Sequence, residues 1–284
     1  MKRTIVTKGE RVPRRNEWVP RRVVATVFVL ALVSMLLPRS ARADRKYFVE
    51  TYTPYLAPAG ELELETWLTS RSGKAEDQGS TAWEWRQEFE YSITNRLTAA
   101  AYLNFDQPGG GALRFKAPSL EFIYALADPG RIPGHPALYL ETTESGEELE
   151  LEPKLLLAHR SRRFVGAMNL VGEFEFRHND EELLEDGTVM RKAWAWRVVG
   201  GAAYELSSRV SAGVEGRYVA EYPNFGPRSG SAFSLGPVFN VQAGEVQIGV
   251  GVLRQLRGSP HTSGDLNLDE FERTQVRAII GVEL

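Results

Sequence analysis

Glutamate side chains recur at every second residue in several stretches of this 284-residue chain, as at Glu61, Glu63 and Glu65. Paired carboxylates are the groups that glycoside hydrolysis uses as acid and base. Here they are too many, and too evenly spaced, for one acid and one base to stand out. A period of two places these side chains on one face of a β-strand. The pattern therefore indicates charged strand faces and no glycosidase site.

His261-Thr262-Ser263 has the His-x-Ser spacing that could serve the hydrolysis of lipids. A serine nucleophile also needs a base that is oriented by a third polar group, and an oxyanion site. This pair lies in a connection bounded by glycine and proline rather than on a strand. We therefore predict no catalytic residue, and a lipid hydrolase remains an alternative.

The sequence also predicts no metal and no cofactor. The chain has no cysteine, and its four histidines lie in different connections or strand ends without the spacing of metal ligands. The glycine run at 109–111 lacks the lysine and the following helix of a phosphate-binding loop.

Residues 1–43 have the organisation of a secretory signal peptide: a basic stretch, an apolar run at 23–37, and small residues at Ala41 and Ala43. The apolar run is shorter than the ~20 residues that a membrane-spanning helix needs. We expect cleavage after Ala43, and an uncleaved anchor is the alternative. The mature chain would carry 24 Lys and Arg against 35 Asp and Glu, a net charge of −11. Such acidity argues against a nucleic-acid partner.

Beyond the leader, short segments alternate apolar and polar residues and are separated by turn residues. A period of two predicts strands rather than helices. Twelve such segments predict an all-β fold, a transmembrane antiparallel up-and-down β-barrel. The predicted strands span residues 60–71, 81–93, 97–105, 116–126, 137–144, 148–160, 164–178, 191–206, 210–222, 231–241, 246–257 and 271–284.

The connections between these strands alternate in length. Short turns, as at 94–96, are separated mostly by longer polar connections, as at 179–190. Short periplasmic turns and long external loops are typical of outer-membrane barrels. Two connections depart from the rule, a long one among the short turns at 127–136 and a short one among the long connections at 145–147.

The apolar face of each strand is expected to meet lipid, as at Val250, and the alternate positions to face the lumen, as at Gly249. Aromatic residues of the apolar face lie near the strand ends and predict two girdles at the membrane interfaces. A soluble β-sandwich or lipocalin is the alternative, but it gives no reason to sort aromatic residues by strand end. We expect arginine at Val250 to destabilise the barrel, and arginine at Gly249 to cost distinctly less.

The inward face carries charged residues on the first strands and small residues on the last five, as at Gly201, Ala203, Gly249 and Gly251. Its charged positions hold sixteen glutamates against six arginines and lysines. Acidic rings favour cations in a narrow pore. The predicted permeation residues are Glu63, Glu65, Arg86, Glu88, Glu90, Glu150, Glu152, Glu173, Glu175, Arg177, Arg197 and Arg217.

Two short turns, at 91–97 and 204–210, share a Tyr-x-x-x-x-Arg-Leu/Val pattern. The segment Pro-Ser-Leu-Glu-Phe-Ile-Tyr-Ala-Leu-Ala-Asp-Pro at 118–129 is followed by Pro-Ala-Leu-Tyr-Leu-Glu at 136–141. In these features the chain resembles the outer-membrane transporter family of the MetA pathway of phenol degradation. The resemblance covers most of residues 60–284 and implies a twelve-stranded barrel that passes small solutes, without implying particular binding residues.

The sequence thus predicts a signal peptide over 1–43, a periplasmic segment or plug over 44–59, and an outer-membrane β-barrel over 60–284. The expected function is a passive, weakly cation-preferring channel or transporter for small solutes in the bacterial outer membrane. Its partners would be those solutes, outer-membrane lipid and lipopolysaccharide. A lipid hydrolase, and a structural or surface-recognition barrel without transport, are the alternatives. Side chains can fill a barrel of about eight strands, whereas a barrel of about sixteen strands leaves a wide pore. A barrel of twelve strands lies between these sizes, so both an open and a plugged lumen remain compatible with the sequence.

Overall fold

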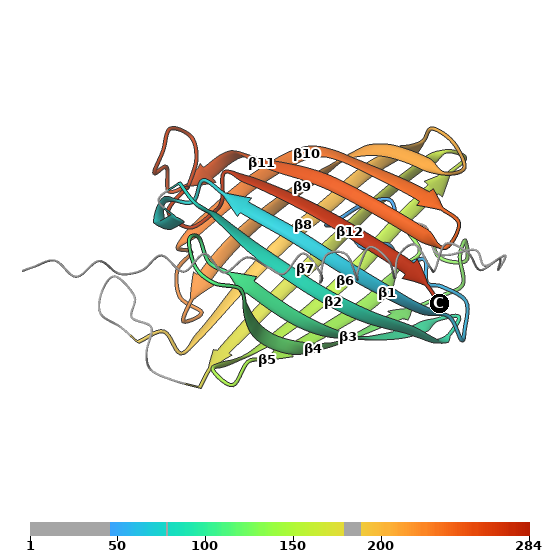
Figure 1. Ribbon diagram of the computed structural model, residues 1–284, viewed down its shortest axis with the longest axis horizontal. Coiled ribbons are helices and arrows are strands. Elements are labelled where there is room, and N and C mark those ends of the chain that lie inside the picture. Colours follow the sequence, from blue (N-terminus) through green and yellow to red (C-terminus); the bar gives the residue numbers. More distant parts are fainter. Residues whose placement is uncertain (1–45, 78, 179–188) are drawn as a thin grey trace, which may run out of the picture. The chain divides into compact units, whose positions relative to one another are not determined.

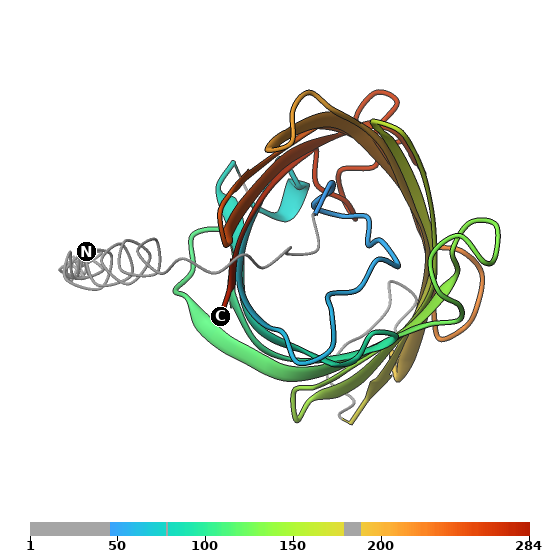
Figure 2. The ribbon, with the colours of Figure 1, turned by 90° about the vertical axis from the view of Figure 1, so that its right-hand side faces the viewer.

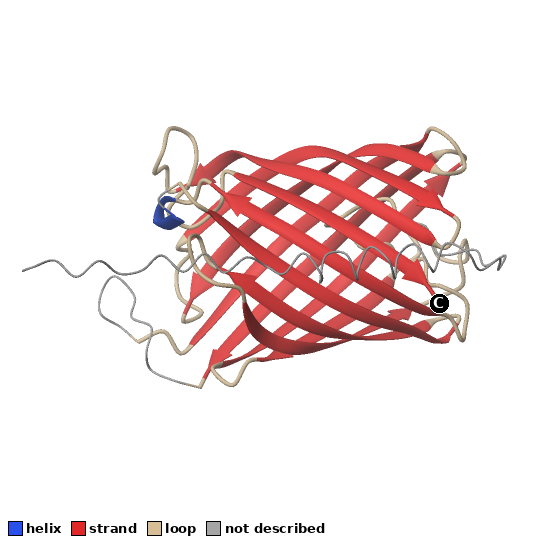
Figure 3. Cartoon of the chain, viewed as in Figure 1, coloured by secondary structure: helices blue, strands red, loops and turns tan. Residues whose placement is uncertain are grey.

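The computed structural model describes residues 46–284, except residue 78 and residues 179–188. The predicted signal peptide and its cleavage position lie outside the described residues. Strands dominate the described chain (Figures 1 and 3), and η1 (Ala75–Asp77) is a short 3-10 helix. Among the described residues, no helix is long and apolar enough to cross a membrane. The strands are β1 (Leu62–Ser72), β2 (Thr81–Thr94), β3 (Leu97–Gln107), β4 (Arg114–Ala125), β5 (Ala137–Glu144), β6 (Glu148–Ser161), β7 (Phe164–Arg177), β8 (Lys192–Glu205), β9 (Val210–Pro223), β10 (Gly230–Ala243), β11 (Val246–Ser259) and β12 (Thr274–Glu283).

The twelve strands form one closed antiparallel barrel, in which neighbours along the chain pair and β1 pairs with β12. Leu68 of β1 lies opposite Trp85 of β2 on one side and opposite Ala278 of β12 on the other. The predicted all-β, twelve-stranded, up-and-down barrel is confirmed. No predicted strand end differs from the observed one by more than three residues.

The largest difference is at β12, which begins at Thr274 because the preceding residues leave the sheet. Phe271 is buried and packs against Val219 and Ala232. The Arg273 N–H donates to the Ser72 carbonyl at 3.0 Å. An apolar residue that packs inside the barrel gives the same signal in a sequence as one on its outer face, so the predicted strand began too early.

The two faces of the strands have different environments. On the outer face, apolar side chains such as Val250 and Ile280 are 41% and 39% exposed. On the inner face, Glu65 and Glu121 are fully buried. A barrel that exposes apolar side chains outward and buries carboxylates inward suits hydrocarbon on its outside. This facing agrees with the alternation in the sequence.

Aromatic pairs lie on the outer face near both ends of the barrel. The rings of Trp194 and Tyr222, near the long connections, stack with centroids 4.4 Å apart. The rings of Phe164 and Tyr204, near the short turns, lie 4.8 Å apart. Aromatic rings at these two levels are typical of membrane interfaces.

Both exceptional connections are present in the fold. The long one between β4 and β5 is closed by a hydrogen bond from the Leu126 N–H to the Pro136 carbonyl, at 2.9 Å. The short one between β5 and β6 is closed by the Ser145 N–H, which donates to the Glu148 carbonyl at 3.1 Å. The alternation in connection length therefore identifies the two ends of the barrel despite these exceptions.

Arginine at Val250 is expected to lower the free energy of unfolding by about 2–4 kcal/mol near the bilayer midplane, because a charge would enter hydrocarbon. Urea unfolding from lipid vesicles measures the change. Arginine at Glu150, an inward position beside a cavity, is the matched control and should cost distinctly less. A larger loss at Glu150 than at Val250 would show that the two faces are exchanged.

Candidate functional site

Residues 46–59, which we call the N-terminal segment, lie inside the barrel (Figure 2, blue). Tyr47, Phe48 and Val49 are no more than 3% exposed, although they belong to no strand. The segment reaches the lumen interior and returns to the short-turn end, where the Ala59 N–H donates to Asn95 Oδ1 at 2.9 Å. The lumen is therefore partly filled by the chain itself.

Glu215, on β9, holds the middle of the N-terminal segment. Its carboxylate accepts hydrogen bonds from the backbone N–H groups of Val49, Glu50 and Thr51, at 3.0, 3.0 and 2.9 Å. A hydrogen bond with an ionised acceptor is stronger than one between neutral groups. A buried N–H without a partner would cost about 1–3 kcal/mol. Glu215 thus takes the place of a neighbouring strand.

Side-chain amides hold the rest of the backbone. Asn169 of β7 accepts from the Tyr52 N–H at 2.8 Å and donates to the Tyr52 carbonyl at 2.9 Å. Asn240 of β10 donates to the Tyr47 carbonyl at 2.6 Å. Gln247 of β11 accepts from the Lys46 N–H at 3.1 Å. Buried main-chain groups need such partners, and the inner wall supplies them.

The small residues of the last strands make room for the N-terminal segment. A Cβ atom built at Gly201 would lie 2.5 Å from the Phe48 ring, and one at Gly251 would lie 2.3 Å from Val49 Cγ2. At Gly249 it would lie 2.5 Å from Asn240 Oδ1 and 3.1 Å from Val49 Cγ1. Gly249 faces inward, but the space before it is occupied, so arginine there would displace Asn240 and Val49, and the distinctly smaller cost expected at Gly249 than at Val250 does not follow from its facing alone.

Two charged residues of the N-terminal segment form ion pairs with the wall. Lys46 pairs with Glu65 of β1. The Glu50 carboxylate lies 2.8 Å from Arg277 Nη1 and 3.7 Å from Arg217 Nη1. The segment is thus held by charge as well as by hydrogen bonds and packing.

Two adjacent cavities lie between the N-terminal segment and the long connections. The first, of about 340 Å³, is lined in part by Glu50 and Tyr52. The second, of about 350 Å³, is lined in part by Lys74 and Glu270 of the long connections. Seven acidic and seven basic residues line the first cavity: Glu50, Glu84, Asp106, Glu141, Glu150, Glu152 and Glu173, and Arg71, Arg86, Lys116, Lys154, Arg197, Arg217 and Arg277.

The twelve predicted permeation residues lie at three levels of the lumen. Four glutamates surround Lys46 near the short turns, six residues line the first cavity, and two lie on β7 near the long connections. These groups are Glu63, Glu65, Glu88 and Glu90; Arg86, Glu150, Glu152, Glu173, Arg197 and Arg217; and Glu175 and Arg177.

Much of this charge is paired. Arg86 pairs with Glu141, and Arg197 pairs with Glu152 and Glu173. Because paired charges neutralise one another, counting residues in the sequence overstates the electrostatic field in the lumen.

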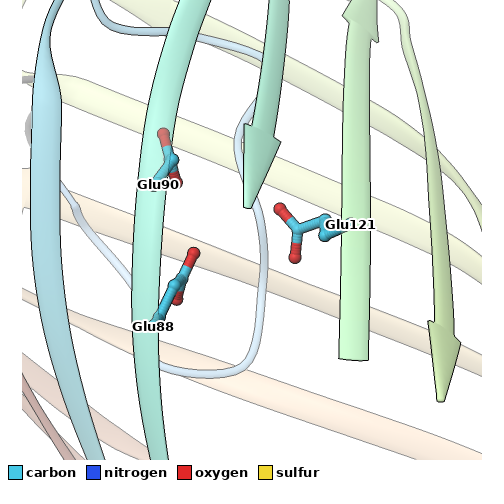
Figure 4. A group of neighbouring side chains, drawn as sticks. All are labelled: Glu88, Glu90 and Glu121. Atoms are coloured by element: carbon cyan, nitrogen blue, oxygen red, sulfur yellow. The ribbon is translucent and has the colours of Figure 1, made fainter. Parts of the chain in front are cut away.

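Three carboxylates from two strands also gather in a group that sequence spacing does not predict. Glu88 and Glu90 of β2 and Glu121 of β4 point toward one another (Figure 4), with an oxygen from each within 4.8 Å of the others. The Tyr102 hydroxyl donates to Glu121, and Trp67 Nε1 donates to Glu88 at 3.0 Å. Carboxylates in such a group could ligate Ca²⁺ or Mg²⁺, but acids and their own hydrogen bonds do not by themselves make a metal site.

Sequence reasoning missed the residues that hold the N-terminal segment. Asn169, Asn240 and Gln247 are buried polar residues at inward positions of their strands. An amide on the inner face of a strand, isolated among small residues, is the signal that could have indicated them. Such an amide does not indicate which residue of the N-terminal segment it binds.

Several known proteins are similar to this chain in fold. The model of a family of unknown function (DUF6662) matches residues 40–128, and no curated protein matches the chain. The COG4313 outer membrane channel from Pseudomonas putida F1 is similar over 84% of this chain and 100% of its own, with 11% identity and a TM-score of 0.56. A NanC porin is similar over 78% of this chain and 98% of its own, with 14% identity and a TM-score of 0.51.

The chain has the fold of outer-membrane channels. At these sequence identities the similarity concerns the barrel, not the solute. The MetA pathway transporters are not among these similar proteins. The resemblance to them therefore supports only the proposed function.

Alanine at Gly251 is expected to displace the N-terminal segment without opening the barrel, because its Cβ would overlap Val49 Cγ2. Overpacking costs about 1–3 kcal/mol, so hydrogen exchange at the amides of residues 47–52 should accelerate about tenfold or more. Adding Val49→Ala removes the clashing methyl groups and should restore slow exchange, with Val49→Ala alone as the control. Unchanged exchange in Gly251→Ala, or no restoration in the double variant, would contradict this packing.

Glu272, in the connection between β11 and β12, should contribute stability that depends on pH. Burial raises the pKa of its carboxyl, but Arg217 and Arg71 outweigh this and lower the pKa from 4.5 to about 2. A carboxyl with a lowered pKa stabilises the fold above its unfolded value, and the contribution is lost as the pH falls through the folded value. The difference in thermal unfolding midpoint between wild type and Glu272→Gln should therefore shrink between pH 4.5 and about 2. A difference that does not change with pH would contradict the assignment.

Proposed function

We propose that this protein is a passive outer-membrane channel for small solutes, narrowed by its own N-terminal segment. The observation that carries the proposal is a pair of adjacent polar cavities inside a closed barrel whose outer face is apolar. The resemblance to the MetA pathway transporters and the fold shared with the COG4313 channel and NanC porin support it. In this arrangement outer-membrane lipid and lipopolysaccharide surround the barrel, and solutes enter between the long connections.

The proposed maturation follows from the same arrangement. Removal of residues 1–43 would leave Asp44 as the new N-terminus, two residues before the described start of the N-terminal segment. Residues 44–59 would then act as a plug that fills the short-turn half of the lumen. The first cavity ends on this plug, at Glu50 and Tyr52.

The proposed weak cation preference rests on the two ends of the lumen. At the long connections, seven acidic residues and four basic residues line the second cavity. At the short turns, Glu63, Glu65, Glu88 and Glu90 lie near Lys46. Acidic entrances raise the local concentration of cations, whereas the balanced first cavity contributes little to the selectivity.

No structural observation favours the hydrolase alternative. His261 and Ser263 lie in an exposed part of the connection between β11 and β12, where Ser263 forms a β-bridge with Leu266. A nucleophile needs an oriented base and a site for the oxyanion, and His-x-Ser spacing alone supplies neither.

In planar bilayers the purified full chain should conduct, and a KCl gradient should give a cation-selective reversal potential. Glu221→Gln should reduce that preference, because Glu221 lines the second cavity and forms no ion pair with a described residue. Glu150→Gln is the matched control. It also removes an acid that pairs with no described residue, but this acid lines the balanced first cavity, so the preference should change less. Anion selectivity in wild type would contradict the proposed preference, and a barrel without conductance would favour the structural or recognition alternative.

A further inference from the structure

The side chain of Glu50 occupies a recess in the barrel wall. It is only 8% exposed, although it belongs to a segment outside the sheet. Its carboxylate lies 2.8 Å from Arg277 Nη1 and 3.7 Å from Arg217 Nη1, and it accepts a hydrogen bond from Gln275 Nε2. Two guanidinium groups and an amide donor are a set that recognises a carboxylate.

The barrel holds these donors in place, and the N-terminal segment adds one contact, from Arg277 Nη1 to the Val49 carbonyl at 3.2 Å. Arg217 Nη1 donates to Gln275 Oε1 at 2.9 Å, and the second Nη of Arg217 pairs with Glu272. Arg277 Nε donates to Thr69 Oγ1 of β1 at 2.9 Å. Because these contacts link β9, β12 and β1, the recess would keep its shape if Glu50 moved away.

Removal of Glu50 would leave the recess with excess positive charge. Three basic residues lie there, Arg71, Arg217 and Arg277, and three acidic residues form ion pairs with them, namely Glu50, Glu84 and Glu272. Without Glu50 one positive charge is uncompensated in a buried setting. Such a charge is costly unless an anion replaces the missing carboxylate.

The recess also opens toward the entering solute. Glu50, Arg71, Arg217 and Arg277 all line the first cavity, which adjoins the cavity at the long connections. A solute that enters between the long connections therefore meets these arginines without passing the N-terminal segment. Trp67 lies beside them, with its ring centroid 5.4 Å from the Arg277 guanidinium, and offers an apolar surface.

We infer that Glu50 fills a binding site for the carboxylate of a small organic anion, and that carboxylate solutes compete with Glu50 for Arg217 and Arg277. This inference rests on the proposed channel function and names a class of solute for it. The site lies between two acidic ends of the lumen, so it concerns recognition of a solute and not the preference among inorganic ions. While Glu50 is tethered beside the site, its effective concentration there is high, and the binding of competing carboxylates is therefore weak.

The test uses acetate and the full chain carrying Glu50→Ala. Acetate restores the missing carboxylate, so calorimetric titration at fixed chloride should show binding about tenfold or more tighter than to wild type. The double variant Glu50→Ala/Arg277→Gln should lose this gain. Glu50→Gln is the matched control: it fills the recess with an uncharged group of the same size and should not gain acetate binding.

Heat-modifiable migration on gels shows whether each variant has a folded barrel, and Glu50→Ser is a second small substitution if Glu50→Ala does not fold. Equal acetate binding by wild type and the small variants, or a gain that survives Arg277→Gln, would overturn the inference. Conductance is measured separately on the same samples. Acetate binding without conductance would support the carboxylate site and contradict the channel, whereas conductance without acetate binding would do the reverse.

Discussion

A main chain that lies inside a closed barrel has no strand beside it, so its buried N–H and C=O groups must find side-chain or water partners. This constraint explains why polar residues occur at particular points of the inner wall. Glu215 accepts hydrogen bonds from three consecutive main-chain N–H groups, and Asn169 bonds to both the main-chain N–H and the carbonyl of Tyr52. The small residues beside them, Gly249 and Gly251, bring the wall close enough to pack against Val49. Hydrogen bonding and packing together determine where the lumen is filled and where a cavity remains.

Charge on the wall obeys a related constraint. A charged group in a narrow lumen loses part of its hydration, and a partner must compensate for it. Arg197 contacts both Glu152 and Glu173, and Arg217 contacts both Glu50 and Glu272. One basic group therefore often serves two acids from different elements. The wall can carry many charges because few of them act alone.

The strands could be predicted from the sequence because every strand meets two environments, apolar outside and polar inside, and so alternates in composition. Val250 and Gly249 show this at adjacent positions. The closing pair of β1 with β12 followed from the same reasoning, since a closed barrel leaves no free edge. Boundaries were least accurate at Phe271, where an apolar residue turns inward.

The interior arrangement could not be predicted in the same way. The N-terminal segment has no period, because its contacts come from several strands rather than from two regular faces. The small residues of the last strands were visible in the sequence, but their role depends on Phe48 and Val49, which lie far away in the chain. Likewise, the convergence of Glu88, Glu90 and Glu121 depends on the register of three neighbouring strands. Sequence patterns identify a face, whereas the partner across the lumen follows only from the closed barrel.

The long sequence separation of these contacts has a consequence for assembly. The N-terminal segment precedes every strand, yet most of its hydrogen-bond partners lie 117 to 228 residues further along, from Asn169 to Arg277. Contacts of such high order carry a loop-closure cost and form late. The first part of the chain to be synthesised is therefore among the last to find its place. Until β9 and β11 are in position, Tyr47, Phe48 and Val49 have no wall to pack against, so a chaperone or assembly factor would meet them as an exposed apolar stretch.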